Sequence, residues 1–401
     1  MQDNYFSLTR VRLRHYRSIA AADVELGRLL LLVGPNGAGK SNFLDALRLL
    51  SESLQTSLDQ ALRSRGGVTE VCRRTAGHPA RFAIDLEFRA PDFHGEYGFE
   101  VAAVEGGGFR VSRERCHVWH GVRSDPEEGR PTASFRVVDG EMTHTTEAVM
   151  PPVGEQRLTL VTAAGLEPFR PVYDGLAGIS VFSLNPDVMR QPQTPDSGEF
   201  LHRDGSNTAS VLHRLQRSGR GRANQARIEE YLQQIVPGMH GVTRAELGNW
   251  ETLEFLQDAP GTESPWRFQA QSVSDGTLRA LGVLVSLFAG TGSTLSTIGI
   301  EEPESALHPA AAGVLLDALR DASERRQVIV TSHSPDLLDR HDFELSELRA
   351  VRAIDGETRI GPLDEAGALA LREHLYTPGE LLRNDQLLPA TDTDSSSEVH
   401  R

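Results

Sequence analysis

The sequence predicts an α/β fold organised around a glycine-rich loop near its N-terminal end. A continuous apolar run at residues 29–33 is typical of a strand buried on both faces, and residues 42–50 then show helical periodicity. The pattern G-x-x-x-x-G-K-S lies between them, from Gly34 to Ser41. Two more buried strands, at residues 298–300 and 327–331, are separated by a helical segment. Strands that alternate with helices in this way favour an α/β fold.

Strand, glycine loop and helix in this order form the context that a phosphate-binding loop requires. Glycine reaches backbone angles that a Cβ forbids, so the loop can wrap around an oxyanion. The amide groups of the loop and the N-terminus of the helix supply positive potential. We therefore expect a nucleotide site, with Lys40 at the β- and γ-phosphates and the Ser41 hydroxyl on Mg²⁺. The expected nucleotide-binding residues of the loop are Gly34, Pro35, Asn36, Gly37, Ala38, Gly39, Lys40, Ser41 and Asn42.

Lysine usage supports this site. Lys40 is the only lysine in the chain, although lysine and arginine together number 41. A compact ammonium fits between phosphates where a planar guanidinium does not, so lysine is retained where arginine cannot replace it.

Composition is that of a globular protein of 401 residues, with 39% apolar residues and a net charge of -15. Cys72 and Cys116 are its two cysteines, which favours a reducing compartment without a disulfide framework. Residues 1–4 begin no signal pattern, and the apolar run at 281–289 is too short to cross a bilayer. We expect a cytoplasmic protein. The acidic balance excludes a broadly basic nucleic-acid-binding surface, so any DNA contact would be local.

Residues 8–16 alternate apolar and basic side chains and predict a strand with Arg10, Arg12 and Arg14 on one face. These arginines are a candidate contact for a phosphate backbone. A solvated face on an edge strand is the commoner explanation of such a pattern.

Residues 81–139 predict an antiparallel β section, because short alternating strands are separated by turns rich in Gly and Asp. Its expected strands are 82–88, 97–104 and 109–118. The segment 123–156, rich in Pro, Gly and Glu, is expected to form loops.

The rest of the chain alternates between helical and strand patterns. Expected strands lie at 179–182, within 241–256, at 347–353 and at 358–360. Expected helices lie at 199–215 and 224–235, from an opening segment at 271–279 to about 288, and at 310–323. Residues 389–401 are rich in Ser, Thr and Asp and are expected to be disordered.

The strand at 298–300 ends in two acidic residues, Glu301 and Glu302. Phosphoryl transfer needs a held Mg²⁺ and an oriented water. We expect Glu301 in the Mg²⁺ shell and Glu302 as the general base. An ordinary acidic loop after a strand is the alternative.

Two further groups of candidate site residues are indicated by their positions at the ends of predicted elements. His333 comes directly after the strand at 327–331, where it can face the γ-phosphate, although a lone histidine is more often structural. Ser274, Asp275 and Gly276 begin a helix, which suits anion binding; taken alone, they would be a helix cap.

Together these segments resemble the ABC-type ATPases, and within them the SMC, RecF and OLD-like group often called AAA family ATPases. The resemblance is carried by G-P-N-G-A-G-K-S-N, S-D-G-T-L-R, I-E-E-P-E-S-A-L-H-P and T-S-H-S-P, at residues 34–42, 274–279, 300–309 and 331–335. Their order and spacing match the group, and most of the chain is similar to a stand-alone ATPase of this kind.

The resemblance implies an ABC-type ATPase head, a P-loop NTPase fold with an antiparallel β lobe and an inserted helical and β region. It implies Walker A at 34–41, a signature motif at 274–277, Walker B at 298–302, a D-loop at 305–308 and a switch histidine at His333. It further implies ATP and Mg²⁺ as cofactors and a homodimer that sandwiches ATP, with each signature motif on the partner's γ-phosphate. DNA repair or antiviral defence with a separate effector protein is the implied output.

The sequence also departs from the group. The signature reads S-D-G-T rather than L-S-G-G-Q, no glutamine stands out as a Q-loop, and the long heptad arms of SMC proteins are absent. The chain after His333 lacks the acidic pattern of a Toprim domain, so we expect no nuclease activity in it.

Expected segments are an N-terminal ATPase lobe at 1–178, an inserted region at 179–270, a C-terminal lobe at 271–388 and the tail at 389–401. Two alternatives stay open: a nucleotide-gated scaffold that controls a toxin or nuclease with little turnover, and a transporter ATPase subunit. The long stretch between Ser41 and Ser274 argues against the transporter.

Overall fold

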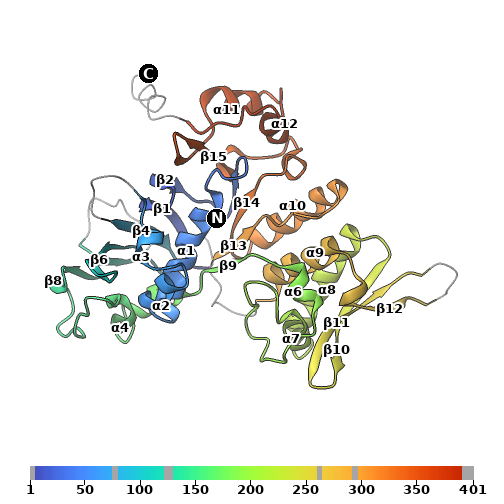
Figure 1. The fold of residues 1–401 in the computed structure, drawn as a ribbon, viewed down its shortest axis with the longest axis horizontal. Helices are drawn as coiled ribbons and strands as arrows, with labels where there is room; N and C mark the ends of the chain where they lie inside the picture. Colours follow the sequence, from blue (N-terminus) through green and yellow to red (C-terminus); the bar gives the residue numbers. More distant parts are fainter. Residues whose placement is uncertain (1–4, 75–79, 122–129, 260–263, 291–296, 391–401) are drawn as a thin grey trace.

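The computed structural model describes residues 5–74, 80–121, 130–259, 264–290 and 297–390, and its ribbon is drawn in Figure 1. Within these ranges a six-stranded sheet has the order β16-β15-β3-β14-β13-β9. Neighbouring strands from β15 to β9 run parallel, and β16 pairs antiparallel to β15. The strands are β3 (Leu29–Val33), β9 (Ser180–Phe182), β13 (Thr297–Glu301), β14 (Gln327–Ser332), β15 (Leu348–Ile354) and β16 (Glu357–Gly361).

Strand β3 lies between two hydrophobic cores, because its side chains alternate between the two faces of the sheet. Leu30 and Leu32 belong to the core that includes α1 (Lys40–Gln55) and the antiparallel sheet. Leu29, Leu31 and Val33 belong to the core on the other face, which includes α9 (Asp275–Phe288) and α10 (Pro309–Ser323). Burial on both faces explains why this strand is continuously apolar.

The antiparallel sheet has the order β2-β1-β4-β5-β6-β7-β8 and lies on the opposite side of the molecule from α9 (Figure 1). It confirms the predicted antiparallel section and extends it. Its strands are β1 (Ser7–Tyr16), β2 (Ile19–Glu25), β4 (Arg81–Arg89), β5 (Phe93–Ala103), β6 (Phe109–His120), β7 (Ala133–Val138) and β8 (Glu141–Thr145).

A third sheet, β10-β11-β12, lies beside α7 and α8. It consists of β10 (Met239–Leu247), β11 (Trp250–Gln257) and β12 (Trp266–Gln269), next to α6 (Pro186–Arg190), α7 (Thr208–Leu215) and α8 (Gly219–Ile235). The remaining α-helices are α2 (Leu58–Arg63), α3 (Val68–Val71), α4 (Thr159–Ala163), α5 (Arg170–Ala177), α11 (Glu365–Arg372) and α12 (Pro378–Arg383). None of the helices in the described ranges is long and apolar enough to span a membrane.

Several sequence-based expectations need correction. Strand β1 is not an edge strand, because it pairs with β2 on one side and β4 on the other. Residues 133–145 form the β7–β8 hairpin rather than a loop. The helix expected at 199–215 comprises only Thr208–Leu215. Pro389 and Ala390 pair with the chain at Leu363 and Pro362, whereas the rest of the expected disordered tail lies outside the described residues.

Candidate active site

The carboxyl ends of β3, β14 and β13 bring the glycine loop, His333 and Glu302 to one edge of the sheet. Val33 is in register with Ser332, and Thr331 is in register with Glu301. The Gly34 amide donates to the Ser332 carbonyl at 3.3 Å, and the Glu302 amide donates to the Thr331 carbonyl at 3.0 Å. Ligand sites of open α/β sheets lie at this edge.

The glycine loop requires glycine at two of its positions. A Cβ on Gly34 would lie 2.0 Å from the Val351 carbonyl oxygen. Gly39 has a φ of 99°, and a Cβ there would also collide with the Thr358 side chain. Thr358 in turn donates its hydroxyl to the Ala38 carbonyl at 2.9 Å, so β16 supports the loop from behind.

Lys40 lies folded back into the loop. Its Nζ donates to the carbonyls of Gly34 at 2.8 Å and Pro35 at 3.0 Å, and the residue is 4% exposed. Burial lowers the pKa of Lys40, and the negative charges of Glu302 and Glu304 oppose that shift. The ammonium is therefore fixed inside the curve of the loop, close to two carboxylates.

Ser41 and Glu301 are the residues expected at Mg²⁺. Ser41 is exposed at the start of α1, and Glu301 is half-buried at the end of β13, with its carboxylate 3.8 Å from Nη2 of Arg203. Among the described residues, no group of three or more His, Cys, Asp and Glu side chains could hold a metal ion. Mg²⁺ bound to a nucleotide takes one or two protein ligands and completes its shell with phosphate and water, so a hydroxyl and a carboxylate fit it.

Asn42 follows Ser41 in α1, and its side chain is linked through Ser18 to Thr358 of β16. Its amide donates to the Ser18 hydroxyl at 2.6 Å, and that hydroxyl lies 2.7 Å from Thr358. Asn42 thus supports the conformation of the loop from its helical end.

Glu302 and His333 face each other. Glu302 has a φ of 45°, in the left-handed region, and its Oε1 lies 3.1 Å from Nδ1 of His333. The two atoms are at ion-pair distance without hydrogen-bond geometry. Their side chains are 37% and 35% exposed, so both are accessible to a bound nucleotide and its water. A non-glycine residue with positive φ at a site edge often reflects a functional constraint.

Glu304 is a site residue that the sequence analysis did not single out, although it lies in the quoted E-E-P-E stretch. It is 7% exposed; its Oε1 accepts from the Ser332 hydroxyl at 2.6 Å, and its Oε2 has no hydrogen-bond partner. Burial raises the pKa of Glu304, and the Ser332 hydrogen bond opposes that shift.

We expect Glu304→Gln to stabilise the protein by about 1 kcal/mol near neutral pH, because a neutral amide removes a buried charge and keeps the Ser332 hydrogen bond. A raised pKa means that the folded state holds the proton to higher pH than the unfolded state. The wild type therefore loses stability as pH rises above the ordinary glutamate range, and the advantage of the variant should widen. Thermal unfolding from pH 4.5 to 8 measures the stability difference between the variant and the wild type. The substitution Glu324→Gln, at an exposed position, is the control. A stability difference that does not change with pH would contradict the interpretation.

The expected signature residues cap α9. Ser274 Oγ accepts from the Thr277 amide at 3.2 Å, and Arg190 pairs with Asp275. A Cβ on Gly276 would lie 2.4 Å from the Ala306 carbonyl oxygen, so this helix end packs against residues 305–308 of the same chain. None of the hydrogen bonds or ion pairs that residues 274–276 make within the described ranges reaches the glycine loop. Ser274 and Asp275 are exposed.

The candidate basic face on β1 is neutralised. Arg10 pairs with Asp23 at 2.5 Å, Arg12 with Glu87 at 2.6 Å and Arg14 with Asp85 at 3.1 Å. Paired cations attract a phosphate backbone far less than free ones, so these three arginines do not form the expected basic patch.

Comparison with known proteins identifies a family and a fold that this chain shares. Residues 29–106 and 174–339 match the family model described as "AAA domain, putative AbiEii toxin, Type IV TA system". The fold is similar to a crystal structure of the Smc head bound to the C-terminal winged-helix domain of ScpA, with 12% identity, a TM-score of 0.53, and coverage of 90% of this chain and 99% of that chain. It is also similar to an Smc head domain with an extended coiled coil, bound to the C-terminal domain of ScpA derived from Pyrococcus furiosus. That match has 12% identity, a TM-score of 0.54, and coverage of 92% and 99%. No curated protein matches the chain.

The glycine loop lies on the mixed α/β fold of an SMC head, which is a P-loop NTPase fold. The matched segments make up more than half of the chain, and the chain belongs to that AAA-domain family.

Proposed function

We propose that this protein binds and hydrolyses ATP with Mg²⁺ at the edge formed by β3, β14 and β13. The observation that carries the proposal is the placement of Glu302 and His333 directly beside the loop that holds Lys40. A general base and an ammonium at one sheet edge are the parts that phosphoryl transfer requires.

Each residue has a defined task in this proposal. The amides of residues 34–41 and the N-terminus of α1 bind the phosphates, and Lys40 exchanges its two carbonyl partners for phosphate oxygens. Ser41 and Glu301 would hold Mg²⁺, which neutralises charge on the phosphates. Glu302 takes the proton of the attacking water, and His333 orients that carboxylate and the γ-phosphate end of the site.

The proposal includes an ATP-dependent homodimer in which the exposed N-terminus of α9 completes the partner's site. Exposure of Ser274 and Asp275, and the lack of bonds from them to the loop of their own chain, support a role between subunits. The segments 1–178, 179–270 and 271–388 are the proposed lobes, with β9 of the middle segment paired to β13 of the last.

The resemblance also supports a role beyond ATP turnover. The protein would act in the cytoplasm on DNA, in repair or antiviral defence, together with a separate effector protein. The similar Smc heads are bound to domains of ScpA, which supports a protein partner here. A DNA contact would need a surface other than the β1 arginines. A scaffold with little turnover is the alternative, and Glu302 beside His333 favours hydrolysis over it.

Lys40 variants test the site. We expect Lys40→Ala to weaken ATP binding by about 10- to 100-fold, since a buried charged hydrogen-bond donor is lost. Lys40→Arg keeps the charge and should also weaken binding, because a guanidinium does not fit the space between the loop carbonyls. Titration calorimetry with Mg-ATP measures both. Wild-type affinity in Lys40→Ala would overturn the nucleotide site.

A further inference from the structure

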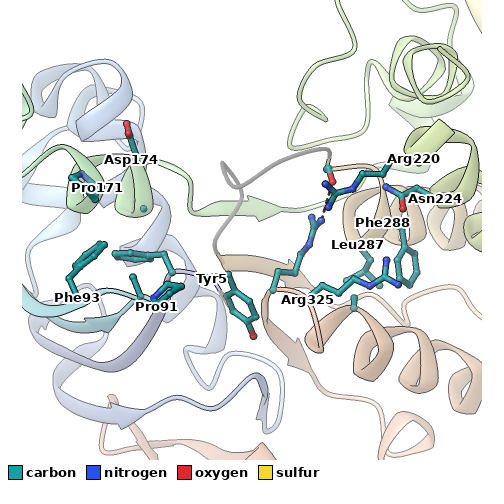
Figure 2. A pocket seen from close by; sticks show the side chains of 16 residues that line it. Tyr5, Pro91, Phe93, Pro171, Asp174, Arg220, Asn224, Leu287, Phe288 and Arg325 are labelled. Atoms are coloured by element: carbon teal, nitrogen blue, oxygen red, sulfur yellow. Dashed lines mark hydrogen bonds between the residues drawn. The ribbon is translucent and has the colours of Figure 1, made fainter. Parts of the chain in front are cut away.

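A second cavity lies away from the glycine loop. Its volume is about 470 Å³, and it opens between the antiparallel lobe and the helices α8, α9 and α10, as Figure 2 shows. This size is within the range of small-molecule sites. We call it the interlobe pocket, and its walls differ in chemistry.

One wall is apolar. Pro91, Phe93 and Pro171 lie on one side of the opening in Figure 2, and Phe6 also lines the pocket. The Phe93 ring packs 6.3 Å from that of Phe6, so it is held in place by an aromatic cluster. Asp174 also lines this wall, but its carboxylate is already bound to Arg170 at 2.9 Å.

The opposite wall carries three arginines without counterions. Arg220, Arg325 and Arg326 have no carboxylate partner among the described residues, whereas the buried Arg65 pairs with both Asp45 and Glu52. Arg326 is 9% exposed; its Nη2 donates to the Gly290 carbonyl at 3.2 Å, and its Nη1 has no acceptor. Burying a charge is costly unless it is paired, so an anion in the pocket would stabilise the buried Arg326, with the exposed Arg220 and Arg325 adding positive potential beside it.

Two more observations agree with an anion site at this wall. Burial lowers the pKa of Arg326 to about 10, and the positive charges of Arg220 and Arg325 add to the shift. Asn224 lines the same wall, and its side-chain amide makes no hydrogen bond within the described part of the chain. That amide is free to donate to and accept from a ligand.

We propose that the interlobe pocket binds a nucleotide unit, with its phosphate on the arginine wall and its base against Pro91, Phe93 and Pro171. Guanidinium groups bind phosphate oxygens in a bidentate manner, and bases stack on aromatic and apolar side chains of any sequence. The unit is either a free mononucleotide or part of a single strand, since both present the same chemistry. This site is separate from the proposed ATP site and does not depend on it.

Binding is tested in the Lys40→Ala background, so that the glycine loop contributes little. The probes are AMP, inorganic phosphate and a 5′-phosphorylated ten-nucleotide oligo(dA), titrated by calorimetry. Charge reversal at two exposed positions, Arg220→Glu with Arg325→Glu, should weaken binding by about tenfold or more, because like charges then face the phosphate. Arg217→Glu, exposed before α8 and outside the pocket, is the matched control and should leave binding unchanged.

The titrations show whether the pocket binds a free nucleotide or a single strand, or they contradict the proposal. Tight AMP binding identifies a free nucleotide, and binding of the oligonucleotide without AMP identifies a strand. Both results support the pocket if the charge reversal weakens binding by about tenfold or more and the Arg217→Glu control does not. The proposal is overturned if AMP and the oligonucleotide both fail to bind, if the double reversal leaves affinity unchanged, or if phosphate alone binds as tightly as AMP.

Discussion

Glu302→Gln is expected to lower ATP turnover by about two to four orders of magnitude, because the amide cannot accept the proton of the attacking water. ATP binding should persist, since the loop and Lys40 are unchanged. The carboxylate lies 3.1 Å from His333 Nδ1 at the loop edge, where a base must stand. Phosphate release at saturating Mg-ATP measures the rate, and equilibrium binding of ATP measures the retained affinity.

Two controls separate chemistry from folding. Glu302 adopts a φ of 45°, so any substitution there could disturb the turn after β13. Glu302→Asp keeps a carboxylate on a shorter side chain. If the Gln and Asp variants both unfold at the same temperature as the wild type, a folding defect is excluded. Wild-type turnover in Glu302→Gln would show that another residue is the base and would favour the scaffold alternative.

A mixture of Lys40→Ala and Ser274→Arg proteins is expected to recover ATPase activity that neither has alone. Ser274→Arg should block the dimer sandwich by bulk at an exposed helix end, while its own glycine loop still binds ATP. A mixed dimer contains one site with an intact loop and an intact partner helix. Random pairing makes half of the dimers mixed, so recovery should reach about a quarter of the wild-type rate.

The complementation needs its own controls. Ser274→Arg also removes an N-cap, which costs about 1 kcal/mol, so Ser274→Ala is the matched variant that loses the cap without adding bulk. We expect the alanine variant to keep most of its activity. Light scattering of Glu302→Gln with ATP should detect a dimer. Full activity in Ser274→Arg alone, or a monomer under every nucleotide condition, would rule out a shared site.

Local signals explain which elements the sequence could predict. The strands β3, β13 and β14 are short apolar runs buried on both faces, and each is followed by residues with a distinct chemistry. The start of α9 was predicted from Ser274, whose hydroxyl caps the helix. These features depend on residues that are close together in the chain.

The errors also have physical causes. The β7–β8 turn is Asp139-Gly140, with φ values of 47° and 81°, a hairpin signal that lies within a stretch of loop-like composition. Residues 199–207 have apolar side chains only at Phe200 and Leu201, and side-chain bonds such as that from Asn207 to the Phe200 carbonyl hold them in turns. Glu304 and Arg203 could not be placed from the sequence, because Arg203 meets Glu301 only through the tertiary fold.

The hydroxyl of Thr358 that supports the Ala38 carbonyl joins residues 320 positions apart. During synthesis, the glycine loop is made long before the residues of β16 that support it. The loop therefore cannot reach its final rigidity until β16 has left the ribosome and paired with β15. A newborn chain is thus expected to acquire full ATP affinity only after β16 has paired with β15.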